Sequence, residues 1–118
     1  MQPDRSSLLP RQFGPLQGMR IISSGTIIAQ PFAAAMAAEM GAEVIQIERP
    51  GQGDAVWRNL EFPIEGNDGT TVAAGWVQNR RNSFHITLDL SSAKGRELFL
   101  NLIPQADLWM ESSIPGTY

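Results

Sequence analysis

The chain has 118 residues, of which 42% are hydrophobic and 18% charged, which is the size and composition of one globular domain. A net charge of -3 with nine Lys and Arg residues provides no broad basic surface, and this argues against nucleic acid as a partner. Because the chain has no cysteine and one histidine, its composition excludes disulfides, thiolate catalysis and Cys-rich or His-rich metal sites, and we expect no metal.

Residues 1–17 contain three prolines and no apolar signal region, so they predict an N-terminal arm and not a secretion signal. No later apolar run reaches the roughly 20 residues that a membrane helix needs. We therefore expect a soluble, cytoplasmic protein with no membrane partner.

Residues 18–51 predict a βαβ unit, around which the rest of the chain is arranged. An apolar run at residues 19–23 ends in Ser-Gly-Thr turn chemistry and predicts the first strand. A proline suited to a first helical turn, followed by an Ala-rich run, predicts a helix at residues 31–40. Alternation over residues 43–48 predicts a second strand, so the two strands are expected to be parallel.

The predicted helix has two features that concern function. Its face on the sheet is expected to be formed by the alanines Ala33, Ala34, Ala37 and Ala38, whose role is close packing. Its N-terminus follows the carboxyl end of a strand, where open α/β sheets bind ligands, and helix N-termini favour phosphate.

Residues 49–82 are rich in turn residues and predict a long irregular excursion, in which Trp57, Phe62 and Trp76 indicate packed parts. A helical turn is expected at residues 73–77.

The remaining elements have clearer patterns. Apolar residues alternate from Phe84 to Leu90 and predict a third strand. Ser91 or Ser92 is expected to cap a helix that ends near Pro104, and residues 106–111 predict a fourth strand.

Several residues have alternative interpretations. A dinucleotide site is disfavoured, because no second or third glycine follows Gly25, although Glu48 lies at a suitable distance. His85 is either a general base or an ordinary strand residue. The aspartates, Asp54 among them, suit turns and strand ends. The pair Arg80 and Arg81 is either a solvated surface pair or a phosphate site.

An ordered series of short segments covers nearly the whole chain after residue 13, and it is more specific than any one motif. It consists of residues 14–16, 18–22, 28–33, 40–54, 79–82, 86–90, 95–97, 106–107, 111 and 115–116. The series resembles the opening of class III CoA-transferases, the CaiB/BaiF family. Residues 13–16 and 80–82 are most similar to the carnitine branch.

The resemblance implies an α/β fold with a Rossmann-like parallel sheet and flanking helices. Residues 18–118 would form the N-terminal part of the family's large domain, in enzymes that are interlocked homodimers. CoA, a substrate and not a covalently bound cofactor, would lie across the carboxyl ends of the strands.

By position, the resemblance also implies the contacts with CoA. Arg49 would reach the nucleotide phosphates, which suit the fork of a guanidinium. The full set of implied contacts is Ile27, Ile28, Ala29, Arg49, Arg80, Arg81, Ser83, Ser112 and Ser113. The sequence departs from the family pattern at two places. Many members have Lys in place of Ser83, and Asn-Phe in place of Ser112 and Ser113.

The family mechanism uses an Asp that attacks an acyl-CoA and then carries CoA as a thioester to an acceptor carboxylate. This catalytic Asp would lie beyond residue 118, so we expect residues 1–118 to be inactive alone. The leading hypothesis is therefore the CoA-binding part of a transferase that moves CoA from an acyl-CoA to a carboxylic acid, with a carnitine-like acid as one candidate. A non-catalytic CoA or nucleotide module and a Rossmann oxidoreductase fragment remain alternatives.

Overall fold

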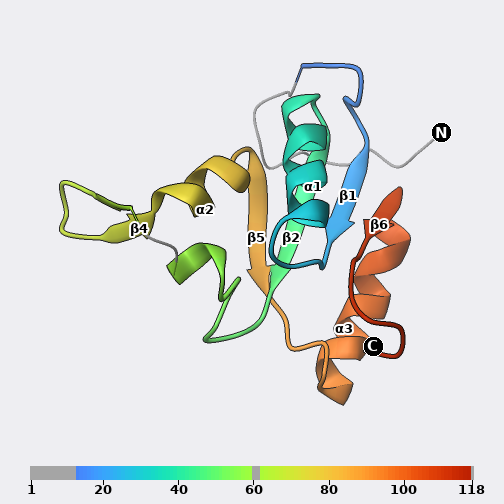
Figure 1. Ribbon diagram of the computed structural model, residues 1–118. Helices are drawn as coiled ribbons and strands as arrows, with labels where there is room; N and C mark the ends of the chain where they lie inside the picture. Colours follow the sequence, from blue (N-terminus) through green and yellow to red (C-terminus); the bar gives the residue numbers. More distant parts are fainter. Residues whose placement is uncertain (1–12, 60–61, 118) are drawn as a thin grey trace.

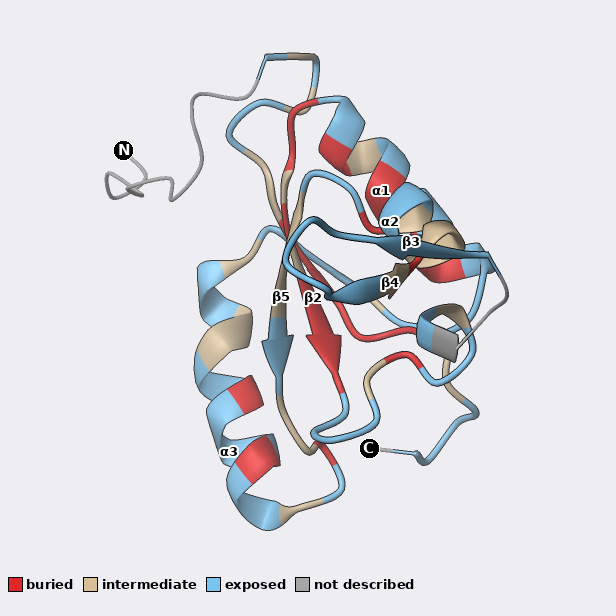
Figure 2. Ribbon diagram, turned by 90° about the vertical axis from the view of Figure 1, so that its left-hand side faces the viewer, coloured by how far each residue is buried: buried red, intermediate tan, exposed pale blue. Residues whose placement is uncertain are grey.

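The computed structural model describes residues 13–59 and 62–117, which form an α/β fold (Figure 1). Four parallel strands make one sheet in the order β5-β2-β1-β6. The strands are β1 (Arg20–Ser23), β2 (Glu43–Glu48), β5 (Ser83–Thr87) and β6 (Leu108–Met110). Helices α1 (Ala29–Glu39) and α3 (Ala93–Leu102) cover opposite faces of the sheet (Figure 2). The expected Rossmann-like class, a parallel sheet with flanking helices, is confirmed.

Successive residues of β1 build the two halves of the core, because side chains alternate across a strand. Ile21 belongs to the cluster under α1, which also contains Ala34, Ala38, Ala42 and Val44. Ile22 belongs to the cluster under α3, which also contains Ile47, Leu90 and Phe99. The central strands β1 and β2 are therefore covered on both sides, as is typical of parallel sheets.

Helix α1 differs from its prediction in two respects. It begins at Ala29, two residues before the predicted start, so Pro31 lies within the first turn, where its missing N–H is not needed. The prediction that Ala33 faces the sheet is wrong. Ala33 is exposed, whereas Ala35 is buried together with Ala34 and Ala38.

Residues 49–82 contain more regular structure than the predicted irregular excursion. A short 3₁₀ turn, η1 (Trp57–Asn59), precedes an antiparallel hairpin of β3 (Pro63–Glu65) and β4 (Thr71–Ala73). Helix α2 (Ala74–Asn79) then leads back to β5, and it confirms the predicted helical turn. The hairpin was missed because its two strands have three residues each, too few for an alternation pattern.

The aromatic residues of this segment divide into two groups. Trp57 and Trp76 are partly buried, as predicted. Phe62 is 77% exposed, so the prediction that it packs is wrong.

Helix α3 follows its sequence signals closely, whereas β5 and β6 are shorter than the strands predicted at residues 84–90 and 106–111. Ser92 caps α3, and its side chain accepts a hydrogen bond from the Gly95 N–H at 2.9 Å. The helix ends at Leu102, and a 3₁₀ turn, η2 (Ile103–Gln105), contains Pro104. Of the helices in the described ranges, none is both long and apolar enough to cross a membrane.

The predicted N-terminal arm is described in part. Residues 1–12 lie outside the described residues. Leu16 donates its N–H to the Met40 carbonyl at 2.9 Å, and its side chain packs against the core under α1. The end of the arm therefore rests on the C-terminus of α1.

Candidate functional site

A pocket with a volume of 230 Å³ lies at the carboxyl ends of β1, β2 and β5. Its wall combines the crossing from β1 to α1, the end of β2 with the loop after it, and the segment after β5. The lining residues are Ser24, Gly25, Thr26, Gln46, Ile47, Glu48, Arg49, Gly53, Asp54, Leu88, Asp89, Leu90, Ser91 and Thr117. The pocket thus occupies the sheet edge at which open α/β folds bind ligands.

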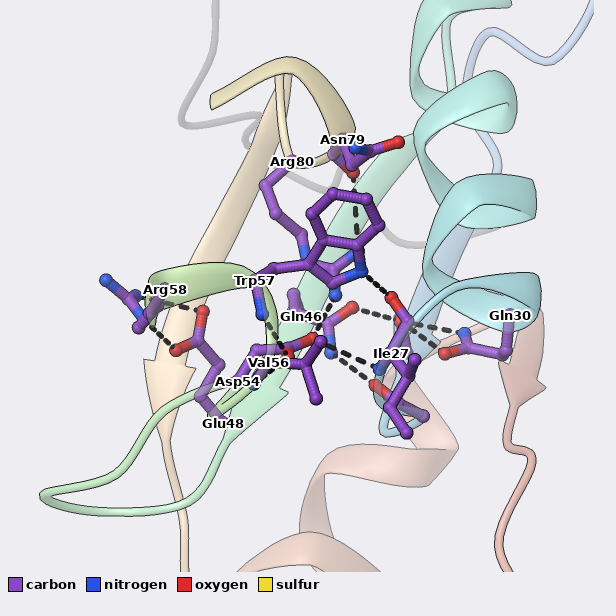
Figure 3. Close-up of polar contacts among 12 residues, drawn as sticks. Ile27, Gln30, Gln46, Glu48, Asp54, Val56, Trp57, Arg58, Asn79 and Arg80 are labelled. Atoms are coloured by element: carbon purple, nitrogen blue, oxygen red, sulfur yellow. Dashed lines mark hydrogen bonds and ion pairs between the residues drawn. The ribbon is translucent and has the colours of Figure 1, made fainter. Parts of the chain in front are cut away.

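A buried polar network fixes the crossing from β1 to α1 on the sheet (Figure 3). Gln46 of β2 donates to the Gly25 carbonyl at 3.0 Å and accepts from the Ser23 hydroxyl. Gln30 of α1 donates to the same hydroxyl at 2.8 Å. All three side chains belong to buried residues, which need such partners because an unpaired buried polar group is costly.

A side chain at position 25 would disturb the buried network. A Cβ atom there would overlap Gln30 Oε1 and would lie 2.8 Å from the Ser112 hydroxyl oxygen, closer than real Cβ contacts. Ser112, which follows β6, therefore lies beside the crossing and near the pocket.

Ile27, in the same crossing, has a left-handed backbone with a φ of 68°. A β-branched residue in this region is a genuine outlier, and such strain costs on the order of 1–3 kcal/mol. Its N–H donates to Asp54 Oδ2 at 3.2 Å, and its carbonyl accepts from the Trp57 indole N–H (Figure 3). The strained residue is thus held by the segment that follows β2.

Asp54 is a buried carboxylate with four hydrogen-bond donors around it. Besides Ile27, it accepts from the backbone N–H groups of Val56 at 3.2 Å and Trp57 at 3.1 Å. Its ion pair with Arg80 is almost fully buried, with side-chain exposures of 3% for Asp54 and 2% for Arg80. Burial lowers the pKa of the Arg80 guanidinium, and the charge of Asp54 opposes that shift.

Glu48, at the end of β2, is held by two side chains. Arg58 donates to it twice, at 2.6 and 3.0 Å, and His85 Nδ1 lies 2.7 Å from Oε1. Burial by itself raises the pKa of Glu48, but the hydrogen bonds and charges of Arg58 and His85 outweigh it and lower the pKa below its ordinary value. Trp76 packs against this group, 4.3 Å from the Arg58 guanidinium and 5.0 Å from the His85 ring.

Ser83, His85 and Glu48 are connected in the order of a nucleophile, a base and an acid. The contact from Ser83 Oγ to His85 Nε2 is 3.1 Å. However, the Ser83 hydroxyl donates to the Arg80 carbonyl at the shorter distance of 2.6 Å, so its proton is directed to the backbone. This geometry supports the interpretation of His85 as a structural strand residue.

Of the nine predicted CoA contacts, the structure places Arg49 among the residues that line the pocket, and it places five others close to lining residues in the chain or in space. Arg49 lines it and is exposed. The pKa of the neighbouring Asp89 is lowered, first by hydrogen bonds from Ser91 and also by the charge of Arg49. Ile27, Ile28 and Ala29 directly follow the lining residue Thr26 and are exposed. Ser112 lies beside Gly25, and Ser113 is next to it in the chain.

Other predicted contacts lie elsewhere. Ser83 starts β5 at the amino edge of the sheet, opposite Val44 of β2. Arg81 pairs with Glu39 at the end of α1 that is far from Ile27. Arg80 is buried with Asp54, so the description of Arg80 and Arg81 as a solvated pair is wrong for Arg80. None of these three residues lines the pocket.

Sequence reasoning missed the connections among polar residues. Asp54 was assigned to a turn, and nothing in one sequence links it to Arg80, 26 positions later. Gln46 offered a weak signal, as a polar residue within the apolar run of β2. In the described part of the chain, no group of His, Asp and Glu side chains is arranged to hold a metal ion.

Comparison with known proteins identifies the family of the chain. The family model described as CoA-transferase family III matches residues 16–118, most of the chain. The chain belongs to this family. The resemblance inferred from its segments is thereby confirmed.

The relatives of the chain are named for different carboxylic acids. The chain is 38% identical over 103 residues to the succinyl-CoA–L-malate CoA-transferase alpha subunit of Chloroflexus aurantiacus, covering 87% of the chain and 23% of the relative. It is 37% identical over 102 residues to the L-carnitine CoA-transferase of Proteus mirabilis, covering 86% and 22%. The chain therefore spans less than a quarter of the length of these curated relatives.

A solved structure is also similar to this chain over only part of its own length. A CaiB/BaiF family protein from Brucella suis has a TM-score of 0.75 and 32% identity with this chain. The match covers 85% of the chain and 26% of that protein. The described fold is thus that of one segment of a family III structure.

Proposed function

We propose that this chain binds coenzyme A in an enzyme that transfers CoA between an acyl-CoA and a carboxylic acid. The observation that carries the proposal is the pocket at the carboxyl edge of the sheet, lined by Arg49, in a chain of CoA-transferase family III. The rim from Ile27 to Ala29 offers apolar side chains and the N-terminus of α1, which favours phosphate and other anions. Ser112, whose hydroxyl lies beside Gly25 in the same crossing, adds a polar group, and Ser113 follows it in the chain.

The acceptor that we propose is a carboxylic acid, with a carnitine-like acid as one candidate. The similarity of residues 13–16 and 80–82 to the carnitine branch supports that candidate. The relatives named for L-malate and L-carnitine are 38% and 37% identical to the chain, so overall identity favours neither acid. We further propose a homodimer, on the strength of the family resemblance alone, and a cytoplasmic location.

Arg49→Ala tests the proposed phosphate contact. A guanidinium that binds a phosphate group makes a charge-assisted hydrogen bond, so its loss should raise the Kd for CoA about tenfold, equivalent to about 1.4 kcal/mol. Pantetheine, which lacks the nucleotide phosphates, should bind the variant and the wild type equally. Isothermal titration calorimetry on the whole protein that carries this sequence measures both affinities.

Lys94→Ala is the matched control, because it removes one positive charge from the exposed side of α3, where Lys94 pairs with Glu97. It should leave both affinities unchanged. Arg81→Ala and Ser83→Ala test the predicted contacts at the other edge of the sheet. Equal weakening of CoA and pantetheine by Arg49→Ala would contradict a phosphate role, and no binding of CoA by the wild type would refute the proposal.

A further inference from the structure

The left-handed backbone of Ile27 needs support beyond the packing of its own side chain. The residue is 47% exposed, so its side chain is only partly packed. Strained conformations persist only where their surroundings determine them from several directions. The contacts of the Ile27 backbone supply this further support.

Both backbone polar groups of Ile27 are bound by residues 54–57. The N–H donates to Asp54 Oδ2 at 3.2 Å, and the carbonyl accepts from Trp57 Nε1. These two contacts approach the residue from the same segment, as Figure 3 shows. A residue held at both its donor and its acceptor cannot rotate without breaking one of these bonds.

The segment that holds Ile27 is itself immobilised. Asp54 Oδ1 accepts from the N–H groups of Val56 and Trp57, and the Asp54 carbonyl accepts from the Arg58 N–H at 3.0 Å. The buried ion pair with Arg80 attaches this turn to the end of α2. Asp54 therefore connects three segments of the chain through one carboxylate.

Helix α1 depends on this arrangement because it lacks a side-chain cap. Ile28 occupies the N-cap position without a side-chain hydrogen bond, and the first turn has no acidic residue. The first helical bond, from the Phe32 N–H to the Ile28 carbonyl at 2.9 Å, directly follows Ile27. The direction in which the helix starts is thus set by the Ile27 backbone.

We propose that Asp54 and Trp57 are positioning residues, which hold Ile27 in its left-handed conformation and so place Ile28 and the first turn of α1 against CoA. The placement toward CoA rests on the proposed function, whereas the holding of Ile27 does not. Neither residue needs to touch the reacting atoms.

Trp57→Phe tests the inference, because it keeps an aromatic ring and removes the indole N–H. In the variant, NMR scalar couplings that report the sign of φ at Ile27 should show a change toward negative φ. The Ile27 amide should exchange with solvent at least tenfold faster than in the wild type. The Kd for CoA of the whole protein should rise about tenfold.

Trp76→Phe is the matched control. Trp76 Nε1 is buried and has no hydrogen-bond partner among the described residues, so the same substitution there removes a donor that bonds nothing. It should leave φ at Ile27 and the affinity for CoA unchanged.

Ile27→Gly provides the rescue, because glycine adopts the left-handed region without strain. When Trp57→Phe is added to Ile27→Gly, it should weaken CoA binding less than threefold, against about tenfold when it is made in the wild type. Any effect on CoA binding of losing the Ile27 side chain cancels in this comparison, since the single variant Ile27→Gly and the double variant both lack that side chain.

Retention of a positive φ at Ile27 in Trp57→Phe would overturn the inference. An equal loss of CoA affinity on adding Trp57→Phe to the wild type and to Ile27→Gly would also overturn it. If the wild type does not bind CoA, the proposed function fails, and the couplings and the amide exchange still decide whether residues 54–57 hold Ile27.

Discussion

At the scale of single residues, the carboxylate of Glu48 has the clearest energetic consequence. It is 5% exposed and is stabilised as an anion by Arg58 and His85, which together lower its pKa. A group with a lowered folded pKa contributes stability above its unfolded pKa, near 4.5, and that contribution is lost as the pH falls through the folded value. The anion of Glu48 therefore stabilises the protein at neutral pH.

Arg58→Ala should lower the free energy of unfolding at pH 7 by about 1–2 kcal/mol, because a buried carboxylate loses two charged donors. The expected loss of stability is modest, since the Arg58 side chain is 40% exposed and its charge is screened by solvent. The difference between variant and wild type should shrink as the pH falls from about 4.5, the unfolded pKa, toward the lower folded pKa of Glu48. Chemical denaturation of both proteins at a series of pH values measures this difference in the free energy of unfolding.

The control for Arg58→Ala is Arg81→Ala, which breaks an arginine–glutamate pair whose side chains are 42% and 41% exposed. Its effect at pH 7 should be clearly smaller. Equal effects of the two variants would contradict the assignment of a stabilising role to Glu48.

At the scale of elements, α1 lies close to the sheet because alanines form its buried face. Ala34 and Ala38 are each 2% exposed and pack with Ile21 and Val44. A close-packed interface of small side chains has no room for a longer one.

Ala38→Leu should therefore lower the free energy of unfolding by about 1–3 kcal/mol through overpacking. Ala33→Leu, on the exposed side of the same helix, should change it by less than about 0.5 kcal/mol. Thermal or chemical denaturation of both variants measures the difference. A larger loss for Ala33→Leu than for Ala38→Leu would show that the helix faces the sheet with its other side.

The elements with strong local patterns were predictable. Residues 43–48 formed β2 as expected, and Ser92 caps α3 as its sequence indicated. The hairpin of β3 and β4 was not predictable, because each strand has three residues and most of them are exposed. Its strands form through pairing with each other, which a local pattern does not record.

At the scale of the whole molecule, the candidate site is assembled from segments that are distant in the chain. The pocket combines the last residues of β2 and residues that follow β1, β2 and β5 with Thr117 near the C-terminus. Parallel pairing brings these strand ends to one edge, since each strand enters the sheet in the same direction. The CoA site that we propose is a consequence of this topology.

We predict that the transferase reaction requires residues outside this chain, because the family's nucleophilic Asp is expected beyond residue 118. The whole enzyme, incubated with an acyl-CoA and then with hydroxylamine, should yield a modified Asp that mass spectrometry locates outside residues 1–118. Residues 1–118 produced alone should show no CoA transfer. Modification of an aspartate within residues 1–118 would contradict this prediction.

The sequence by itself determined the family, the parallel α/β class and the edge of the sheet that holds the pocket. These three properties follow from local periodicity, from turn and cap residues, and from an ordered series of segments, all of which can be recognised in the amino-acid sequence. Tertiary structure alone decided that Arg80 is buried against Asp54, that Ser83 lies at the opposite edge from Arg49, and that residues 54–57 hold Ile27. The reason is physical: a buried charge or a strained peptide is stabilised by partners that only folding brings within hydrogen-bond distance.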